Sequence, residues 1–388
     1  MLYQRDFFDA GIDRKGTACE KWDDRAVLAE DAVPLWVADM DFRCPEPISR
    51  ALAARAAHAC YGYTMVEDED VRAMLSFVER RHQLAMKPEE CVMLPCVVTG
   101  LMLFVRCFSA PGERVAMLTP VYGPFREAVE ANGRALVSVP LPRGRDNRYT
   151  IDFDLLEDAF RSGVRMLLAC SPHNPVSRCW TEEELAALLA LCRRYRVMLC
   201  VDEIHADFVF KPHVFRSILS LAEPEDDVVG LMSASKTFNI AGLQQAFALS
   251  RNPGMLERMR QEMRAAGVVS GNLFAMAGTR AAWQEGEAWL DGLMDYLTDN
   301  LALLNRLVRD ELPFARMTPV EATYLAWLDL SAYEGSCERL AEKCRRAGVA
   351  LTGGTFFGPE GEGFMRLNFG CPAAQLTEGV RRLHRALQ

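Results

Sequence analysis

Four short apolar segments in the middle of the chain each end in polar or charged residues. The segments are residues 114–118, 166–170, 197–201 and 228–232. Helical patterns separate them: one ends at Gly133, and another begins at a capping box that Thr181 forms with Glu184. Apolar strands that alternate with amphipathic helices are typical of a mostly parallel sheet covered by helices on both faces. The sequence therefore predicts an α/β fold.

The C-terminal part of the chain has a different pattern. It contains a long helical stretch, a strand, a helix that ends at Gly348, a second strand and a closing helix. The first four of these elements are expected at residues 290–312, 324–330, 337–347 and 365–369. We expect a smaller α+β domain here. The predicted division is an N-terminal segment, residues 1–44, that packs with the small domain, a large domain, residues 45–281, and the small domain, residues 282–388.

The composition excludes several classes of protein. Half of the 388 residues are hydrophobic, and the net charge of −9 argues against nucleic acid or an anionic membrane as the main partner. No apolar stretch approaches the ~18 residues of a membrane helix, and the charged residues among the first 30 leave no apolar region of a signal peptide. The 13 cysteines are scattered without a C-x-x-C. We expect them to be reduced core residues of a cytoplasmic protein.

Four residues follow predicted strands at the edge of the sheet where ligands of open α/β proteins bind: Tyr122, Asn174, Asp202 and Lys236. Each has an ordinary explanation: a loop aromatic, an Asn-Pro turn, a helix cap and a surface lysine. Together they supply what pyridoxal 5'-phosphate requires, namely a lysine for the Schiff base and an aspartate that keeps the pyridine nitrogen protonated. The aromatic ring can stack on the pyridine, and the amide can donate to its phenolic oxygen. The sequence therefore predicts a pyridoxal phosphate site.

Six segments carry a resemblance to a known family. In order along the chain they read PLWVADMDF, YGYT, SPHNPVSRCW, VDEIHADF, SASKTFNIAGLQ and MRLNFGCP. From about Trp36 to Pro372 the chain resembles the pyridoxal phosphate enzymes of fold type I, and more narrowly the MalY/PatB group of cysteine–sulfur β-lyases. The resemblance implies a large domain with a mostly parallel sheet, a smaller C-terminal domain and a homodimer that shares its active sites.

The resemblance also implies roles for single residues. Lys236 would form the Schiff base, Asp202 would pair with the pyridine nitrogen, and Asn174 would bond the phenolic oxygen. Further cofactor contacts would come from the ring of Tyr122, from His205, from the hydroxyls of Ser233 and Ser235, from the backbone N–H groups of Val97 and Val98, and from Tyr63 of the neighbouring subunit. Arg366 would grip the substrate carboxylate, with Asn174 and the backbone near Ala38 beside it.

Four positions depart from the family pattern. Cys96 and Ser177 stand where glycine is common, and Ser171 stands where asparagine is usual. The backbone at position 96 must approach the cofactor phosphate closely. The side chain of Cys96 therefore puts the shape of this phosphate-binding loop in question. Gln244 occupies the position at which many aminotransferases carry a phosphate-binding arginine. An amide cannot replace a bidentate guanidinium, and by the resemblance this position points toward the lyases.

The expected reaction is β-elimination of L-cystathionine or a related S-substituted cysteine to pyruvate, ammonia and a thiol such as homocysteine, within methionine biosynthesis. Two alternatives stay open: an aminotransferase of class I or II, and a regulatory or interaction protein that retains a pyridoxal phosphate site. A metal site is not expected, because Asp202, Glu203, His205 and Asp207 lack the H-E-x-x-H spacing. A nucleotide site is not expected either, because the glycines at 358–363 match no phosphate-binding motif.

Overall fold

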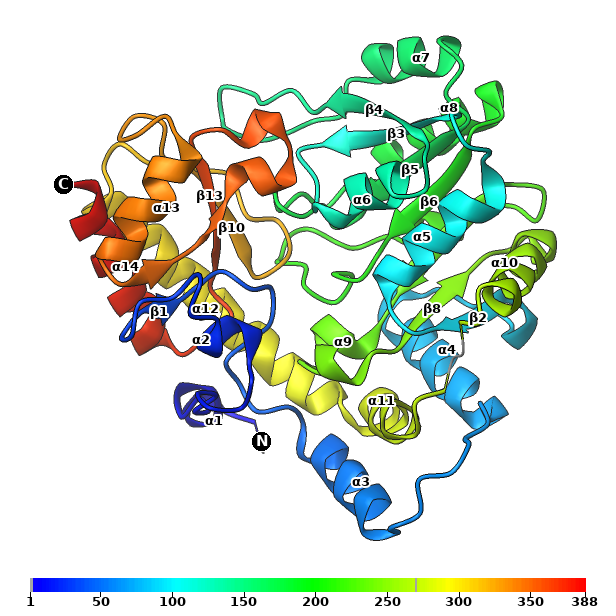
Figure 1. The fold of residues 1–388 in the computed structure, drawn as a ribbon, viewed down its shortest axis with the longest axis horizontal. Helices are drawn as coiled ribbons and strands as arrows, with labels where there is room; N and C mark the ends of the chain where they lie inside the picture. Colours follow the sequence, from blue (N-terminus) through cyan, green and yellow to red (C-terminus); the bar gives the residue numbers. More distant parts are fainter. Residues whose placement is uncertain (1–2, 269–270) are drawn as a thin grey trace.

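The large sheet has seven strands in the order β2-β8-β7-β6-β5-β3-β4 (Figure 1). The computed structural model describes residues 3–268 and 271–388. The strands are β2 (Cys91–Leu94), β3 (Arg114–Thr119), β4 (Ala135–Pro140), β5 (Met166–Cys170), β6 (Met198–Asp202), β7 (Val228–Met232) and β8 (Ala246–Leu249). All neighbours pair in parallel except β8, which is antiparallel to both β7 and β2. This confirms the mostly parallel sheet.

Helices cover both faces of this sheet. Successive residues of β5 enter different apolar clusters: Leu168 packs with one cluster, and Leu167 with the other. The cluster of Leu168 includes α5 (Val97–Phe108), α6 (Pro124–Glu130) and α10 (Pro253–Ala265). The cluster of Leu167 includes α4 (Asp68–His82), α7 (Phe153–Arg161), α8 (Glu182–Tyr195) and α11 (Leu273–Glu285). The two-faced burial explains why these strands are apolar throughout.

The C-terminal part has an antiparallel sheet of its own, in the order β12-β13-β10-β9. Its strands are β9 (Arg316–Met317), β10 (Leu325–Asp329), β12 (Thr352–Gly353) and β13 (Phe364–Asn368), and its helices are α13 (Cys337–Arg346) and α14 (Ala373–Leu387). The long helix α12 (Glu287–Glu311, yellow) runs from α11 to these elements (Figure 1).

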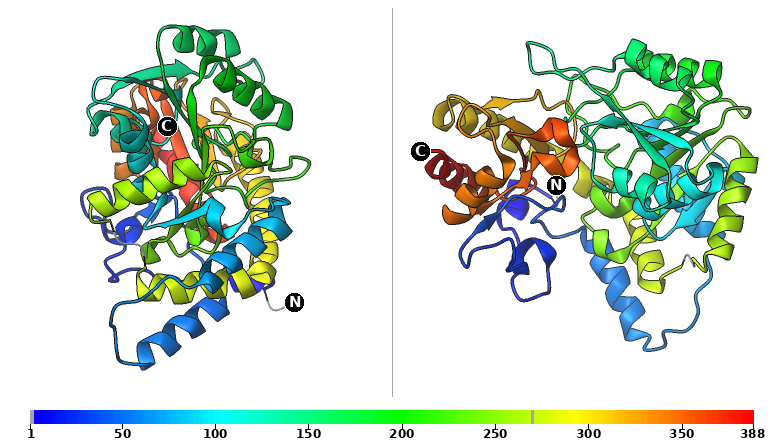
Figure 2. Two further views of the ribbon diagram at one scale, coloured as in Figure 1. Left: turned by 90° about the vertical axis from the view of Figure 1, so that its right-hand side faces the viewer. Right: turned by 45° about the horizontal axis from the view of Figure 1, so that its top comes forward.

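The N-terminal segment lies beside the C-terminal part (Figure 2). Strand β1 (Val33–Pro34) pairs in parallel with β11 (Val349–Ala350). Two short helices, α1 (Arg5–Asp9) and α2 (Glu20–Asp23), precede β1, and α3 (Glu46–Ala57) follows it. This pairing connects the N-terminal segment to the C-terminal part. The predicted domain boundaries at residues 44 and 281 stay predictions.

Short elements complete the fold. The helix α9 (Ala234–Thr237) directly follows β7. The single 3-10 turns are η1 (Pro88–Glu90), η2 (Ile218–Ser220), η3 (Ala241–Leu243), η4 (Gly354–Phe357) and η5 (Pro359–Gly361). The predicted capping box is present, because the Thr181 hydroxyl accepts from the Glu184 N–H at 3.2 Å and the Glu184 carboxylate accepts from the Thr181 N–H at 2.8 Å.

The 13 cysteines are all free. Most are buried in the cores, as predicted, and Cys60 is exposed. Among the helices of the described ranges, none combines the length and apolar character that crossing a bilayer requires.

Candidate active site

A cavity of about 160 Å³ lies at the carboxyl ends of β5, β6 and β7. It is lined by Ala38, Cys96, Val97, Val98, Leu101, Tyr122, Cys170, Asn174, Asp202, Ile204, His205, Ser235, Lys236 and Ala241. Most of the residues named from the sequence therefore meet in one place. The parallel strands explain this grouping, because they bring residues that follow them to a single edge.

Lys236 lies in α9, immediately after β7. Its Nζ donates to the carbonyl oxygen of Ala38 at 2.7 Å. Burial lowers the pKa of Lys236, and the carboxylates of Asp39 and Asp202 oppose this effect. A lysine with a lowered pKa has more of its amine in the neutral form near pH 7, as a general base requires.

Asp202 is the last residue of β6 and is buried. Its carboxylate accepts from the Ile204 N–H at 3.0 Å, and the nearby charge of Lys236 favours its ionised form. Burial raises its pKa to about 6. A buried carboxylate is most stable beside a positively charged donor, so this position suits a protonated ring nitrogen.

Arg366 is a buried cation in β13. It donates to the Asn174 side-chain oxygen at 3.1 Å, to the Trp36 carbonyl at 2.9 Å and to the Thr352 hydroxyl at 3.3 Å. Its Nε has no partner, and within the described chain no carboxylate forms an ion pair with it. Burial lowers its pKa to about 10. An unpaired buried guanidinium favours the binding of an anion from outside.

His205 and Asn174 complete the polar wall. Burial, with the charges of Lys236 and Arg366, lowers the pKa of His205 to about 3, so its ring is neutral. Its Nδ1 has no hydrogen-bond partner among the described residues. The Asn174 oxygen is occupied by Arg366, and this leaves the amide nitrogen to donate to a ligand.

Val97 and Val98, the first two residues of α5, line the cavity, and α5 therefore begins there with its free backbone N–H groups. Such groups have no partner within a helix and favour anions. Cys96 precedes them in an extended conformation with φ −160°, and its Sγ accepts from the Thr99 N–H at 3.4 Å. The cysteine side chain thus caps the helix, and its backbone conformation does not require glycine.

Two predicted phosphate ligands lie outside the lining of the cavity. The Ser233 hydroxyl donates to the Gln245 carbonyl at 2.5 Å and accepts from the Ser235 N–H at 3.0 Å, so it caps α9. Tyr63 is exposed and lies in the link between α3 and α4. This link runs along the outer edge of the molecule in Figure 1. Gln244 is exposed and has φ 55°.

The structure accounts for Ser177 and adds Tyr324, which the sequence did not single out. Ser177 has φ 56°, a conformation that favours glycine, and its hydroxyl donates to the Leu325 carbonyl. Ser171 lies next to the site, and its N–H donates to the Asp202 carbonyl at 2.9 Å.

The Tyr324 hydroxyl donates to the Ala38 carbonyl at 2.9 Å. No local pattern marks Tyr324, because its partner lies in the N-terminal segment.

Two of the four residues considered for a metal site, Glu203 and Asp207, have partners within the chain. Glu203 accepts from the Ser217 hydroxyl at 2.7 Å and from the Ile218 N–H at 2.8 Å. Asp207 lies 3.0 Å from the Nε2 of His82. Across residues 3–268 and 271–388, no three His, Cys, Asp or Glu side chains are grouped as metal ligands.

Comparisons with known proteins agree over nearly the whole chain. Residues 32–383 match the family model described as Aminotransferase class I and II. The chain is 40% identical over 387 residues to cystathionine beta-lyase PatB of Bacillus subtilis (strain 168), which covers 98% of this chain and 99% of that protein. It is 33% identical to protein MalY of Escherichia coli (strain K12), over 98% of each chain. The PLP-bound C-S lyase of Staphylococcus hominis, in the external aldimine form with the inhibitor L-cycloserine, superimposes with TM-score 0.91, 31% identity and 98% coverage of each chain.

Proposed function

Because the chain belongs to the aminotransferase class I and II family, we propose that it is a pyridoxal phosphate-dependent carbon–sulfur lyase. It releases pyruvate, ammonia and a thiol from L-cystathionine or a related S-substituted cysteine. The fold is that of the pyridoxal phosphate enzymes of fold type I. One observation carries the proposal: Lys236 and Asp202 line one cavity, and Arg366, a buried cation with no acidic partner, bonds the Asn174 side chain in its wall.

The residues present fit the cofactor. Asp202 offers a buried carboxylate for the pyridine nitrogen, and the N–H groups of Val97 and Val98 offer donors for the phosphate. The amide nitrogen of Asn174 and the orphaned Nδ1 of His205 provide polar groups for the phenolic oxygen. When bound, the cofactor supplies an electron sink that stabilises negative charge at the substrate Cα.

The residues of the chain then direct the reaction. Arg366 holds the substrate carboxylate, and this fixes the orientation of the bonds at Cα. Lys236, as the neutral amine, removes the Cα proton. The thiolate leaves from Cβ and takes the bonding electron pair of the C–S bond. The remaining three-carbon enamine tautomerises and is hydrolysed to pyruvate and ammonia.

We propose that the lyase works as a homodimer in the cytoplasm. The link between α3 and α4 exposes the side chains of Tyr61, Tyr63 and Met65 by 58%, 111% and 80%. A cluster of exposed apolar side chains is typical of an interaction surface. In this proposal the hydroxyl of Tyr63 of the partner subunit donates to the cofactor phosphate. The Ser233 hydroxyl does not, because it already donates to the Gln245 carbonyl.

Changing Tyr63 to phenylalanine is expected to weaken cofactor binding without unfolding the protein. A hydrogen bond to a charged group contributes about 1.5–3 kcal/mol, so the dissociation constant for the cofactor should rise about 10- to 100-fold. Absorbance titration of the cofactor-free protein measures this constant. Tyr61→Phe is the matched control, because the Tyr61 hydroxyl donates to the Ala56 carbonyl of the same chain. A protein that sediments as a monomer and retains full activity would refute the shared site.

Substrate tests separate the lyase from the aminotransferase. We expect pyruvate and free thiol from L-cystathionine with no 2-oxo acid present. Alanine or glutamate with a 2-oxo acid should give little turnover. Amino transfer that is faster than thiol release on every thioether tested would establish the aminotransferase instead. A protein that binds the cofactor but turns over none of these compounds would support the regulatory or interaction protein.

A further inference from the structure

Residues 36–42, which include Ala38 of the active-site wall, form neither a helix nor a strand. Five successive carbonyl oxygens of this segment, from Trp36 to Met40, accept hydrogen bonds from side chains elsewhere in the chain. The carbonyl of Trp36 accepts from Arg366 and Thr352, that of Val37 from Asn368, that of Ala38 from Lys236 and Tyr324, that of Asp39 from Asn368 and Lys21, and that of Met40 from Asn239 and Arg14. The path of the 36–42 segment is therefore fixed by side-chain contacts and not by a ladder of backbone pairs.

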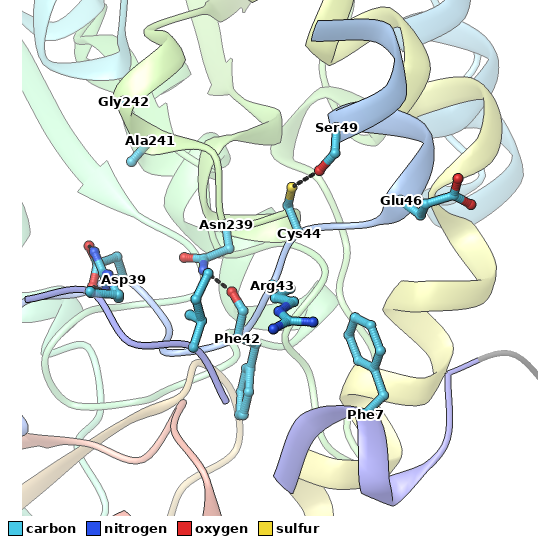
Figure 3. A pocket seen from close by; sticks show the side chains of 12 residues that line it. Phe7, Asp39, Phe42, Arg43, Cys44, Glu46, Ser49, Asn239, Ala241 and Gly242 are labelled. Carbon is cyan, nitrogen blue, oxygen red and sulfur yellow. Dashed lines mark hydrogen bonds and ion pairs between the residues drawn. The ribbon is translucent and has the colours of Figure 1, made fainter. Parts of the chain in front are cut away.

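Asn239 makes three of the contacts that hold this segment. Its side-chain oxygen accepts from the Met40 N–H at 2.9 Å, and its amide nitrogen donates to the carbonyls of Met40 at 2.8 Å and Phe42 at 2.9 Å. Figure 3 shows the amide beside the Phe42 carbonyl. Asn239 lies three residues after Lys236 and has φ 57°, a conformation that asparagine tolerates better than most residues. It therefore links the turn that carries Lys236 to the segment that carries the acceptor of Lys236.

The segment has room to move where this link lies. A cavity of about 570 Å³ borders it, and Asp39, Phe42 and Asn239 are among the residues that line this cavity (Figure 3). An ion cluster also holds the segment: Lys21 Nζ lies 2.8 Å from the Asp41 carboxylate, and Arg14, which lines the same cavity, lies 2.6 Å from that of Asp39. Without the amide of Asn239, the side of the segment that faces the cavity loses three hydrogen bonds.

We propose that Asn239 is a positioning residue that keeps the free amine of Lys236 on the Ala38 carbonyl. The inference rests on the proposed function, in which this amine removes the Cα proton. Four charged groups also act on the amine: the carboxylates of Asp39, Asp202 and Glu20 favour its protonated form, and Arg366 opposes it. The Ala38 carbonyl favours the protonated form as well, because it accepts from the ammonium.

Asn239→Gly tests the proposal, since glycine accepts the positive φ and removes the side chain that carries the amide. In the cofactor-free full chain, the pKa of Lys236 is measured from the pH dependence of its acetylation by acetic anhydride, read by mass spectrometry. It should fall by about one pH unit as the contact with Ala38 loosens. Hydrogen exchange in a peptide covering residues 36–42 should become faster. In the holoenzyme, kcat should fall about tenfold or more while KM changes little.

The matched control is Asn147→Gly. Asn147 has φ 64°, makes no side-chain hydrogen bond in the described chain, and lies in the loop after β4, outside the lining of the active-site cavity. This variant should leave the Lys236 pKa and the exchange of residues 36–42 unchanged. Faster exchange with an unchanged Lys236 pKa and unchanged kcat would show that the amide is only structural, and unchanged exchange would show that it does not hold the segment. Absence of pyruvate release by the unaltered protein would instead refute the proposed function, while the acetylation experiment would still test the link.

Discussion

Lys236→Ala is expected to abolish pyruvate release from L-cystathionine, with a loss of about 10³-fold or more. General base catalysis alone contributes about 10²- to 10⁴-fold, and this variant also removes the amine that attaches the cofactor. Lys236 is the only lysine among the residues that line the cavity, so none of these neighbours can replace it. Pyruvate release is followed with lactate dehydrogenase, and thiol release with a disulfide reagent.

Two controls make this result specific. Lys211→Ala removes an exposed lysine in the segment between β6 and η2 and should leave turnover unchanged. Borohydride reduction of the unaltered protein should fix the cofactor on the peptide that contains Lys236, and the variant should give no such peptide. Pyridoxyl label on another lysine, or normal turnover by Lys236→Ala, would contradict the assignment.

The strands of the sheet differ in how well their sequence predicts them. The observed limits of β5 and β7 are those predicted, because both strands are buried on both faces and end at polar residues. The strands β2 and β8 were not predicted. Each has four residues, too few to separate a strand from a buried helical turn by periodicity. The antiparallel direction of β8 also depends on its neighbours and not on its own residues.

The same distinction applies to the site. Asn174, Asp202 and Lys236 could be grouped from the sequence, because each follows or ends a parallel strand and the carboxyl ends of such strands lie at one edge of the sheet. This inference requires no knowledge of distant contacts. The roles of Tyr324 and Asn239 could not be foreseen. Their partners lie 286 and 199 residues away in the 36–42 segment, whose sequence shows neither helical nor strand periodicity.

Ser233 shows a third limit of the sequence. A hydroxyl two residues before Ser235, at the start of a helix, can serve a phosphate or cap the helix, and the sequence is the same in both cases. The structure gives the Ser233 hydroxyl two partners within the chain, the Gln245 carbonyl and the Ser235 N–H. The choice depends on Gln245, which lies beyond the turn that follows α9.

Arg366→Ala is expected to lower kcat/KM for L-cystathionine by about 10²-fold or more. A charged bidentate contact in a buried site contributes about 2–4 kcal/mol, and each 1.4 kcal/mol or so corresponds to tenfold in kcat/KM. The guanidinium has no acidic partner within the described chain, so its charge is available to the substrate carboxylate. Arg366→Lys keeps the charge but loses the planar fork, so its kcat/KM should lie between those of Arg366→Ala and the unaltered protein.

Arg143 offers a matched control for this prediction. Its guanidinium lies 5.1 Å from the ring of Phe364, as that of Arg366 lies 4.8 Å from the ring of Phe357, but Arg143 is paired with Asp329 at 2.8 Å. Arg143→Ala should therefore change kcat/KM by only a few fold. The cofactor absorbance of Arg366→Ala should match that of the unaltered protein, since Arg366 serves the substrate. If kcat/KM falls equally in Arg366→Ala and Arg143→Ala, or falls only as far as cofactor content falls, Arg366 holds the fold together and does not bind the carboxylate.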